Sequence, residues 1–130
     1  TIQSDGTAYF NGNLIVDGSG SFASVTASGN VTAYSDASLK ENLQVIPNAL
    51  EKVQALTGYT FDRIDTGERQ TGLIAQDVNK VLPEATGDEA VAKRENEMLA
   101  VRYEKLVPLL IEAIKELKEE IEELKRGSSN

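Results

Sequence analysis

The feature of this sequence that most constrains its fold is a run of regularly spaced aliphatic residues near the C-terminus. Six of them follow one another at intervals of 3, 4, 3, 4 and 3 residues: Val107, Leu110, Ile114, Leu117, Ile121 and Leu124. This is the a/d spacing of a coiled coil over three heptads. It predicts a long helix over about residues 103–126 whose apolar seam packs against other helices.

The charges of the same helix argue against the alternative, a monomeric domain that packs the helix onto its own core. Six charged residues lie in its distal half: Glu116, Lys118, Glu119, Glu120, Glu122 and Glu123. With Ile114 at position a, every a residue is Val or Ile and every d residue is Leu. On coiled-coil rules this favours a parallel dimer, in which Glu120 at g faces Lys125 at e of a neighbouring helix.

Composition changes sharply near residue 34, which indicates that two kinds of structure are joined there. Residues 1–34 contain no Lys or Arg, two acidic residues, five Gly and nine Ser or Thr, and all 13 basic residues lie beyond them. Short β-prone runs alternate with turn residues in this part: 8–10, 13–16, 21–23 and 30–32. Such strands bury too little surface to fold alone, so we expect neighbouring copies to stabilise them in an oligomeric β-stem. A disordered Gly/Ser linker is the alternative.

Residues 35–102 mix helices and strands, so the chain as a whole predicts an α+β fold. The pattern indicates helices over 49–56 and 76–82, strands over 59–61 and 71–75, and an extended piece over 98–101. The expected division is a stem at 1–34, a globular part at 35–102, the long helix at 103–126 and a frayed tail at 127–130.

The absence of Cys and His from the 130 residues excludes several classes of site. Ser-His-Asp and Cys-His catalysis, zinc sites of the usual ligand types and disulfide frameworks all need them. With 13 basic and 21 acidic side chains the net charge is −8, so nucleic acid is not an expected partner. No apolar run is long enough for a membrane span, and the first residues do not resemble an export signal. We therefore expect a soluble protein without metal or cofactor.

Asp65-Thr66-Gly67 has the local signature of an aspartic protease, in which two chains would each contribute one aspartate. Arg63, Glu68 and Arg69 surround it, however, and a catalytic turn of that kind lies in apolar surroundings. The charged neighbours instead predict an exposed hairpin turn, in which Asp and Gly are common.

Ser35 and Lys40 lie where the composition changes and form the remaining candidate for chemistry. A serine hydroxyl becomes a nucleophile when a neutral amine accepts its proton, and burial or a nearby cation favours the neutral form of a lysine. The two residues are five apart, so they meet only if the segment bends. The alternative is that Ser35 or Asp36 caps a helix or turn while Asp36 and Lys40 form a surface ion pair.

The stretch 35–42 reads SDASLKEN, which resembles the S-D-x-x-x-K-x-N opening of one known family. This is the peptidase S74 family, the intramolecular chaperone domains at the C-termini of phage tail fibres, tailspikes and endosialidases. Other stretches agree in the same order: 46–50, 72–78, 82–84 and 101–117. The resemblance covers about residues 35–125. At Ser38 the sequence departs from the Arg that many members carry, so the contacts of that Arg are not expected here.

The resemblance implies a homotrimeric chaperone that folds the β-stem preceding it and then cuts itself off, without a cofactor. By the family pattern Ser35 is the nucleophile, Lys40 is the general base, and the Tyr34–Ser35 bond is cleaved. It also implies three chains where the heptad rule alone gives two. Assembly would take place in the host cytoplasm, and the mature fibre would join the virion tail after the chaperone is released.

Two other functions remain open at this point. One is a structural trimerisation domain of a fibre that is never cleaved. The other is a related self-cleaving module of a membrane-bound transcription factor, against which the stem-like residues 1–34 argue. If Lys40 is buried only in the assembled trimer, cleavage would report correct assembly.

Overall fold

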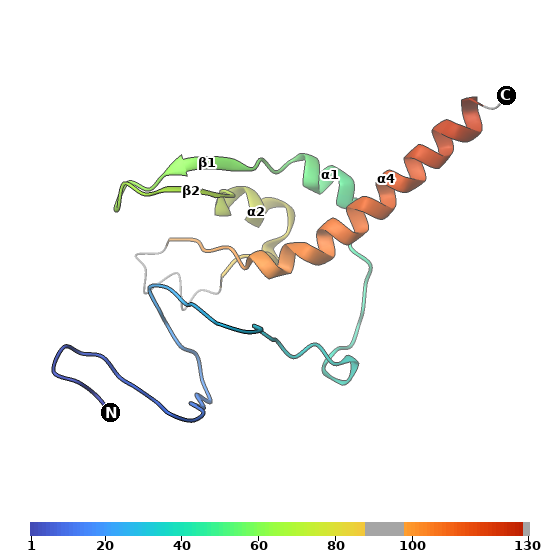
Figure 1. The fold of residues 1–130 in the computed structure, drawn as a ribbon. Coiled ribbons are helices and arrows are strands. Elements are labelled where there is room, and N and C mark those ends of the chain that lie inside the picture. Colours follow the sequence, from blue (N-terminus) through green and yellow to red (C-terminus); the bar gives the residue numbers. More distant parts are fainter. Residues whose placement is uncertain (88–97, 129–130) are drawn as a thin grey trace. The chain divides into compact units, whose positions relative to one another are not determined.

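The computed structural model describes residues 1–87 and 98–128 (Figure 1). The chain divides into two compact units, Thr1–Glu41 and Asn42–Asn130, each of which has its own internal contacts. The sequence-based boundary lies seven residues earlier, after residue 34. The two units are therefore considered one at a time.

In the first unit, residues 1–36 form no strand. Their one β-type pairing is an isolated bridge between Ile2 and Ala8, around a turn in which Gly6 has a φ of 86°. The strands predicted at 8–10, 13–16, 21–23 and 30–32 are thus absent from the single chain. Apart from that bridge, no part of residues 1–36 pairs with these runs, and a short strand without a neighbour leaves its backbone groups unpaired and its side chains in water.

The second unit contains an antiparallel hairpin of β1 (Tyr59–Asp62) and β2 (Arg69–Gly72). Tyr59 pairs with Gly72 at its open end, and Asp62 pairs with Arg69 beside the turn. Gly67 closes that turn with a φ of 73°, which glycine adopts without strain. The second strand begins and ends earlier than the predicted 71–75. It does not extend to Ala75 because the carbonyl of Ile74 already accepts a helical hydrogen bond from Val78.

The helices of this unit agree with the sequence pattern apart from their ends. They are α1 (Ala49–Gln54), α2 (Ala75–Val81) and α4 (Leu106–Ser128), with 3-10 turns at Pro83–Ala85 and Tyr103–Lys105. Pro83 ends α2, as a residue without an N–H does. The long helix continues through Gly127 and Ser128, which were expected in the frayed tail, and residues 129–130 lie outside the described part. The extended piece predicted at 98–101 makes one bridge, between Val101 and Thr86.

The core of the second unit lies where α1, α2 and the first half of α4 meet. Its buried hydrophobic residues are Ala49, Val78, Leu82, Ala85, Leu106, Leu109 and Ala113. Figure 1 shows that α4 continues well past α1, away from the hairpin. Only the first half of the long helix therefore contributes to the core of its own chain.

Helix α1 is held on α4 by an unusual cap. Its N-cap residue, Asn48, has a left-handed φ of 53° and makes no side-chain capping bond. Instead, the carboxylate of Glu116 in α4 accepts the backbone N–H of Ala49 at 2.8 Å and that of Leu50 at 3.1 Å. Glu116 was expected among the solvent-facing charges of the distal helix, but it is half-buried. A carboxylate at a helix N-terminus satisfies donors that the helix itself cannot pair.

Candidate functional site

A single 3-10 turn, Ala37–Leu39, brings Ser35 and Lys40 together. The amide of Leu39 donates to the carbonyl of Asp36 at 3.0 Å, and that of Lys40 donates to Ala37 at 3.1 Å. These bonds reverse the chain over a few residues. The segment therefore has the bend that residues five apart in sequence need in order to meet.

The Lys40 ammonium contacts two oxygens of Ser35. Its Nζ donates to the backbone carbonyl at 3.0 Å and also to the Oγ hydroxyl. In serine–lysine catalysis the amine of the lysine is neutral and accepts the proton of the serine hydroxyl in the first step. The same two atoms, Lys40 Nζ and Ser35 Oγ, are in contact here. The hydrogen bond to the Ser35 carbonyl holds the Lys40 amine beside the Ser35 hydroxyl.

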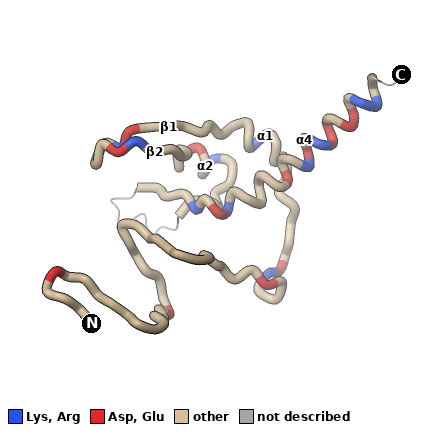
Figure 2. The backbone as a smooth tube through the Cα atoms, viewed as in Figure 1, with Lys and Arg blue, Asp and Glu red and all other residues tan. Residues whose placement is uncertain are grey.

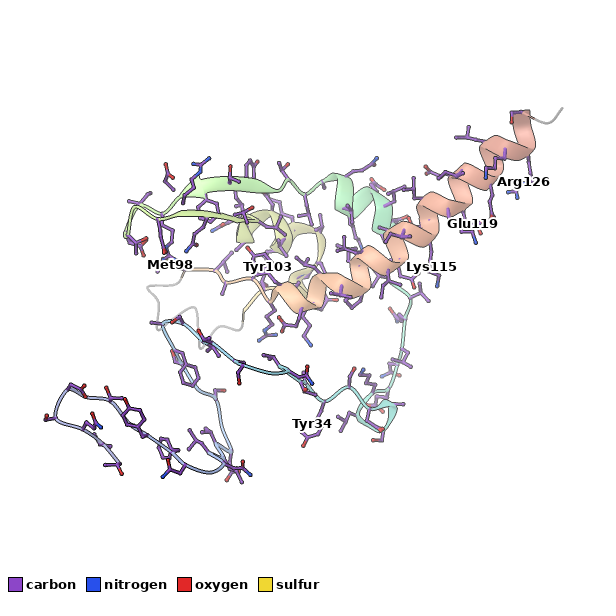
Figure 3. The ribbon with its side chains drawn as sticks, viewed as in Figure 1. Tyr34, Met98, Tyr103, Lys115, Glu119 and Arg126 are labelled. Atoms are coloured by element: carbon purple, nitrogen blue, oxygen red, sulfur yellow. The ribbon has the colours of Figure 1, made fainter. Side chains whose placement is uncertain are left out.

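The surroundings of this pair are open. Every residue from Thr32 to Glu41 is exposed in the single chain, and the side chain of Tyr34 is 97% exposed (Figure 3). Water therefore reaches both members of the pair. Burial would favour the neutral form of a lysine, and the single chain does not bury Lys40.

The predicted seam of α4 lies on the solvent-facing side of the helix. Exposure ranges from 44% at Ile121 to 74% at Leu124, and the other members are exposed as well: Val107, Leu110, Ile114 and Leu117. The buried residues Leu106, Leu109 and Ala113 occupy the adjacent face. The long helix thus has one apolar face for its own core and a second one that the described residues of its chain leave exposed.

The charged side chains are concentrated in the second unit, and many of them lie on the distal half of α4. Figure 2 shows the acidic and basic residues alternating along the distal half of α4, whereas residues 1–34 carry only Asp5 and Asp17. Among the described ion pairs of that helix are Lys115 with Glu112 and Lys118 with Glu122. Charged side chains that pair along the helix leave its apolar seam free.

One contact of the globular part, and the glycine that makes room for it, were not recognised in the sequence. The Tyr103 hydroxyl accepts the backbone N–H of Leu73 at 3.0 Å, which ties the residue after β2 to the 3-10 turn that precedes α4. A Cβ at Gly72 would lie 2.5 Å from the same hydroxyl, so glycine makes room for it. Both residues fall within stretches that carry the family resemblance, and this was the only signal that pointed to them.

Asp65 lies in an exposed hairpin turn, as the charged neighbours predicted. Its carboxylate accepts hydrogen bonds from Arg63 at 2.8 Å and 2.5 Å. The hydrogen bond from Arg63 lowers the pKa of Asp65 to about 2. A carboxyl held ionised in this way is unsuited to sharing a proton with a second aspartate.

Within residues 1–87 and 98–128 no helix has the length and apolar character needed to cross a membrane. The same residues hold no cluster of three or more acidic side chains arranged around a possible metal position.

Comparison with known proteins gives one family match. Residues 35–87 match the peptidase S74 family model, described as chaperone of endosialidase. The match therefore includes both Ser35 and Lys40.

Several named relatives are phage fibre proteins. The chain is 37% identical over 100 residues to the long tail fiber protein Gp37 of Enterobacteria phage K3, across 73% of this chain and 8% of that protein. It is 36% identical over 124 residues to Gp37 of Enterobacteria phage Ox2, across 90% of this chain and 46% of that protein. The chain thus spans less than half the length of these relatives.

Proposed function

We propose that the chain is a tail-fibre chaperone that releases itself by autoproteolysis, since residues 35–87 match the chaperone-of-endosialidase family. In this proposal residues 1–34 are the end of the fibre stem, which is the folding client. The partners are two further copies of the same chain. Assembly takes place in the host cytoplasm, and the fibre without its chaperone enters the virion tail.

The contact between Lys40 and Ser35 is the observation that carries the proposed cleavage. The nucleophile, its base and the bond to be cut lie within a few residues of one another. The Ser35 hydroxyl would attack the carbonyl of Tyr34, the residue directly before it in the same chain, so the attack is intramolecular. Such an arrangement removes the entropy that two separate reactants would lose.

The proposed reaction has two steps. In the first, Ser35 Oγ gives its proton to the neutral Lys40 amine and bonds to the Tyr34 carbonyl carbon. The Tyr34–Ser35 C–N bond breaks, Lys40 passes the proton to the Ser35 nitrogen, and the acyl group of Tyr34 is carried on Oγ as an ester. In the second, water hydrolyses the ester. The stem then ends in a Tyr34 carboxylate, and the chaperone begins with Ser35.

Trimerisation is supported by what a single chain leaves uncovered. Besides the α4 seam, all seven aromatic side chains, three Phe and four Tyr, are exposed. Four of them belong to the stem: Tyr9, Phe10, Phe22 and Tyr34. Apolar surface on this scale is typical of chains that associate. Helix association relies on local contacts and forms quickly, so it can hold three stems in register before their strands pair.

The test is the mass of the full chain followed over time after expression. We expect two products divided between Tyr34 and Ser35, and a single uncut species for Ser35→Ala. Lys40→Gln should slow cleavage by about 10²- to 10⁴-fold, because a general base is lost. Lys80→Gln, at an exposed lysine of α2, is the matched control and should cleave at the original rate. Cleavage that persists in Ser35→Ala, or equal rates for the two lysine variants, would refute the proposal.

A structural trimerisation domain that is never cleaved is the second candidate. The relatives favour it in one respect, since their printed name is that of a fibre protein. In that case the full-length mass would persist with time and Ser35→Ala would change nothing, while the chain would still assemble. Light scattering on the uncut chain separates this outcome from a failure of assembly.

A further inference from the structure

An apolar cavity of about 270 Å³ opens beside the exposed seam of α4. It is lined by residues of α1, of the segment between α1 and β1, of the position after β2 and of α4: Val53, Leu56, Gly58, Leu73, Leu106, Leu109 and Leu110. A site for a small molecule normally includes a few polar groups that orient the ligand. The side chains of this cavity offer carbon only, so the structure favours an aliphatic side chain as its occupant.

The cavity lies on a definite side of the heptad. With Ile114 at position a, Leu106 is at g, Leu109 at c and Leu110 at d. Leu110 thus belongs both to the seam and to the cavity wall. In a parallel coiled coil the g side of one helix faces residue e of its neighbour, five positions further along. For Leu106 this residue is Ile111.

Ile111 has the properties that this position needs. It is 52% exposed, and it lies outside the a/d pattern that accounts for the other apolar residues of the seam. The remaining g and e pairs of the same register are also compatible, since Ala113 meets Lys118 and Glu120 meets Lys125. The pairs therefore change from apolar to oppositely charged along the helix, which favours parallel chains in this register.

We propose that Ile111 of one chain inserts into the apolar cavity beside Leu106 and Leu110 of a second copy. This inference rests on the proposed assembly and specifies its contact. The coiled coil is then locked to the globular parts, because the cavity wall includes Leu56 and Leu73 from outside α4. A neighbour's helix would complete a core that each chain leaves open.

The test uses the absence of cysteine from the chain. In the full chain with Ser35→Ala, the pair Gly58→Cys and Ile111→Cys should form disulfides between chains on mild oxidation. A Cβ at Gly58 meets nothing within 4 Å, so the substitution is tolerated. Ile64→Cys with Ile111→Cys is the control, because Ile64 is fully exposed near the hairpin turn and should not cross-link.

A second measurement gives the strength of the contact. Ile111→Asp should weaken assembly at least about tenfold in chain concentration, as the loss of a buried aliphatic side chain implies. Ile64→Asp should leave assembly unchanged. If the chain with Ser35 assembles and cleaves, but the Ser35→Ala chain with Gly58→Cys and Ile111→Cys forms no disulfide between chains, the inference is wrong and the proposed function stands. If the chain does not assemble at any concentration, both are wrong.

Discussion

Removal of the Glu116 carboxylate should destabilise the globular unit far more than removal of a neighbouring charge. Glu116 accepts the N–H groups of Ala49 and Leu50, and Ala49 is fully buried. A buried donor left without a partner costs about 1–3 kcal/mol, and the loss of an N-cap costs about 0.5–2 kcal/mol. Water can reach Leu50 in part, so we expect a loss of about 2 kcal/mol for Glu116→Ala. Glu116→Gln keeps one acceptor and should lose about 1 kcal/mol.

The assay is thermal and urea unfolding of the full chain, followed by circular dichroism in the Ser35→Ala background. For a unit of this size each kcal/mol lowers Tm by about 4–8 °C, so Glu116→Ala should lower it by about 8–16 °C. Glu119→Ala is the matched control, an exposed glutamate of the same helix (Figure 3). It should change stability by less than about 0.5 kcal/mol. Chain concentration is held constant, since assembly contributes to the measured stability.

Hydrogen exchange identifies the cause of the effect. If Glu116 acts through its two hydrogen bonds, the amides of Ala49 and Leu50 exchange faster in Glu116→Ala, and those of the hairpin change little. Equal Tm shifts for the Glu116 and Glu119 variants would refute the capping role. So would unchanged protection of the Ala49 amide.

Three other positions give measurable outcomes. Asn48→Ala should cost about 1 kcal/mol because of the left-handed φ, and Asn48→Gly should not; equal losses would contradict this. Gly72→Ala should displace Tyr103 and speed exchange of the Leu73 amide, and unchanged exchange would show that the hydroxyl bond is unimportant. The NMR titration of Asp65 should have its midpoint near the pKa of about 2, and Arg63→Gln should raise it toward 3.8. Because this pKa is lowered, the stabilising contact is present above about pH 4 and lost as the pH falls through about 2; a normal midpoint would exclude it.

The elements with a strong local signal could be predicted from the sequence. The α4 periodicity, the stop at Pro83 and the turn at Gly67 each depend on a few adjacent residues, and the structure confirms the helices and the turn. The second strand was misplaced because Leu73 and Ile74 are as suitable for a strand as for the start of a helix. Short apolar runs are ambiguous in this way.

Contacts between distant segments could not be predicted from local patterns. Nothing near Ala49 indicates that its amide is capped by a residue 67 positions away, and Glu116 stands among glutamates that face water. Leu106, Leu109 and Ala113 repeat the 3-4 spacing of the seam one position earlier along the helix. The pattern alone does not say which of the two faces the chain uses for itself. In the proposed assembly the strands of residues 1–34 would pair with other chains, and neither the local pattern nor a single copy supplies that pairing.

The exposure of Ser35 and Lys40 leads to a test of when cleavage occurs. A charged lysine can donate to a serine hydroxyl but cannot accept its proton, and exclusion of water is what disfavours the charge. The single chain leaves both residues exposed, as it does the α4 seam. If assembly provides the burial, the fraction of chains that cleave should follow the fraction assembled. On dilution, or in the variant Ile114→Asp with Leu117→Asp, both should fall together. Cleavage at an undiminished rate in monomers would show instead that the turn at 37–39 suffices by itself, and would remove assembly from the mechanism.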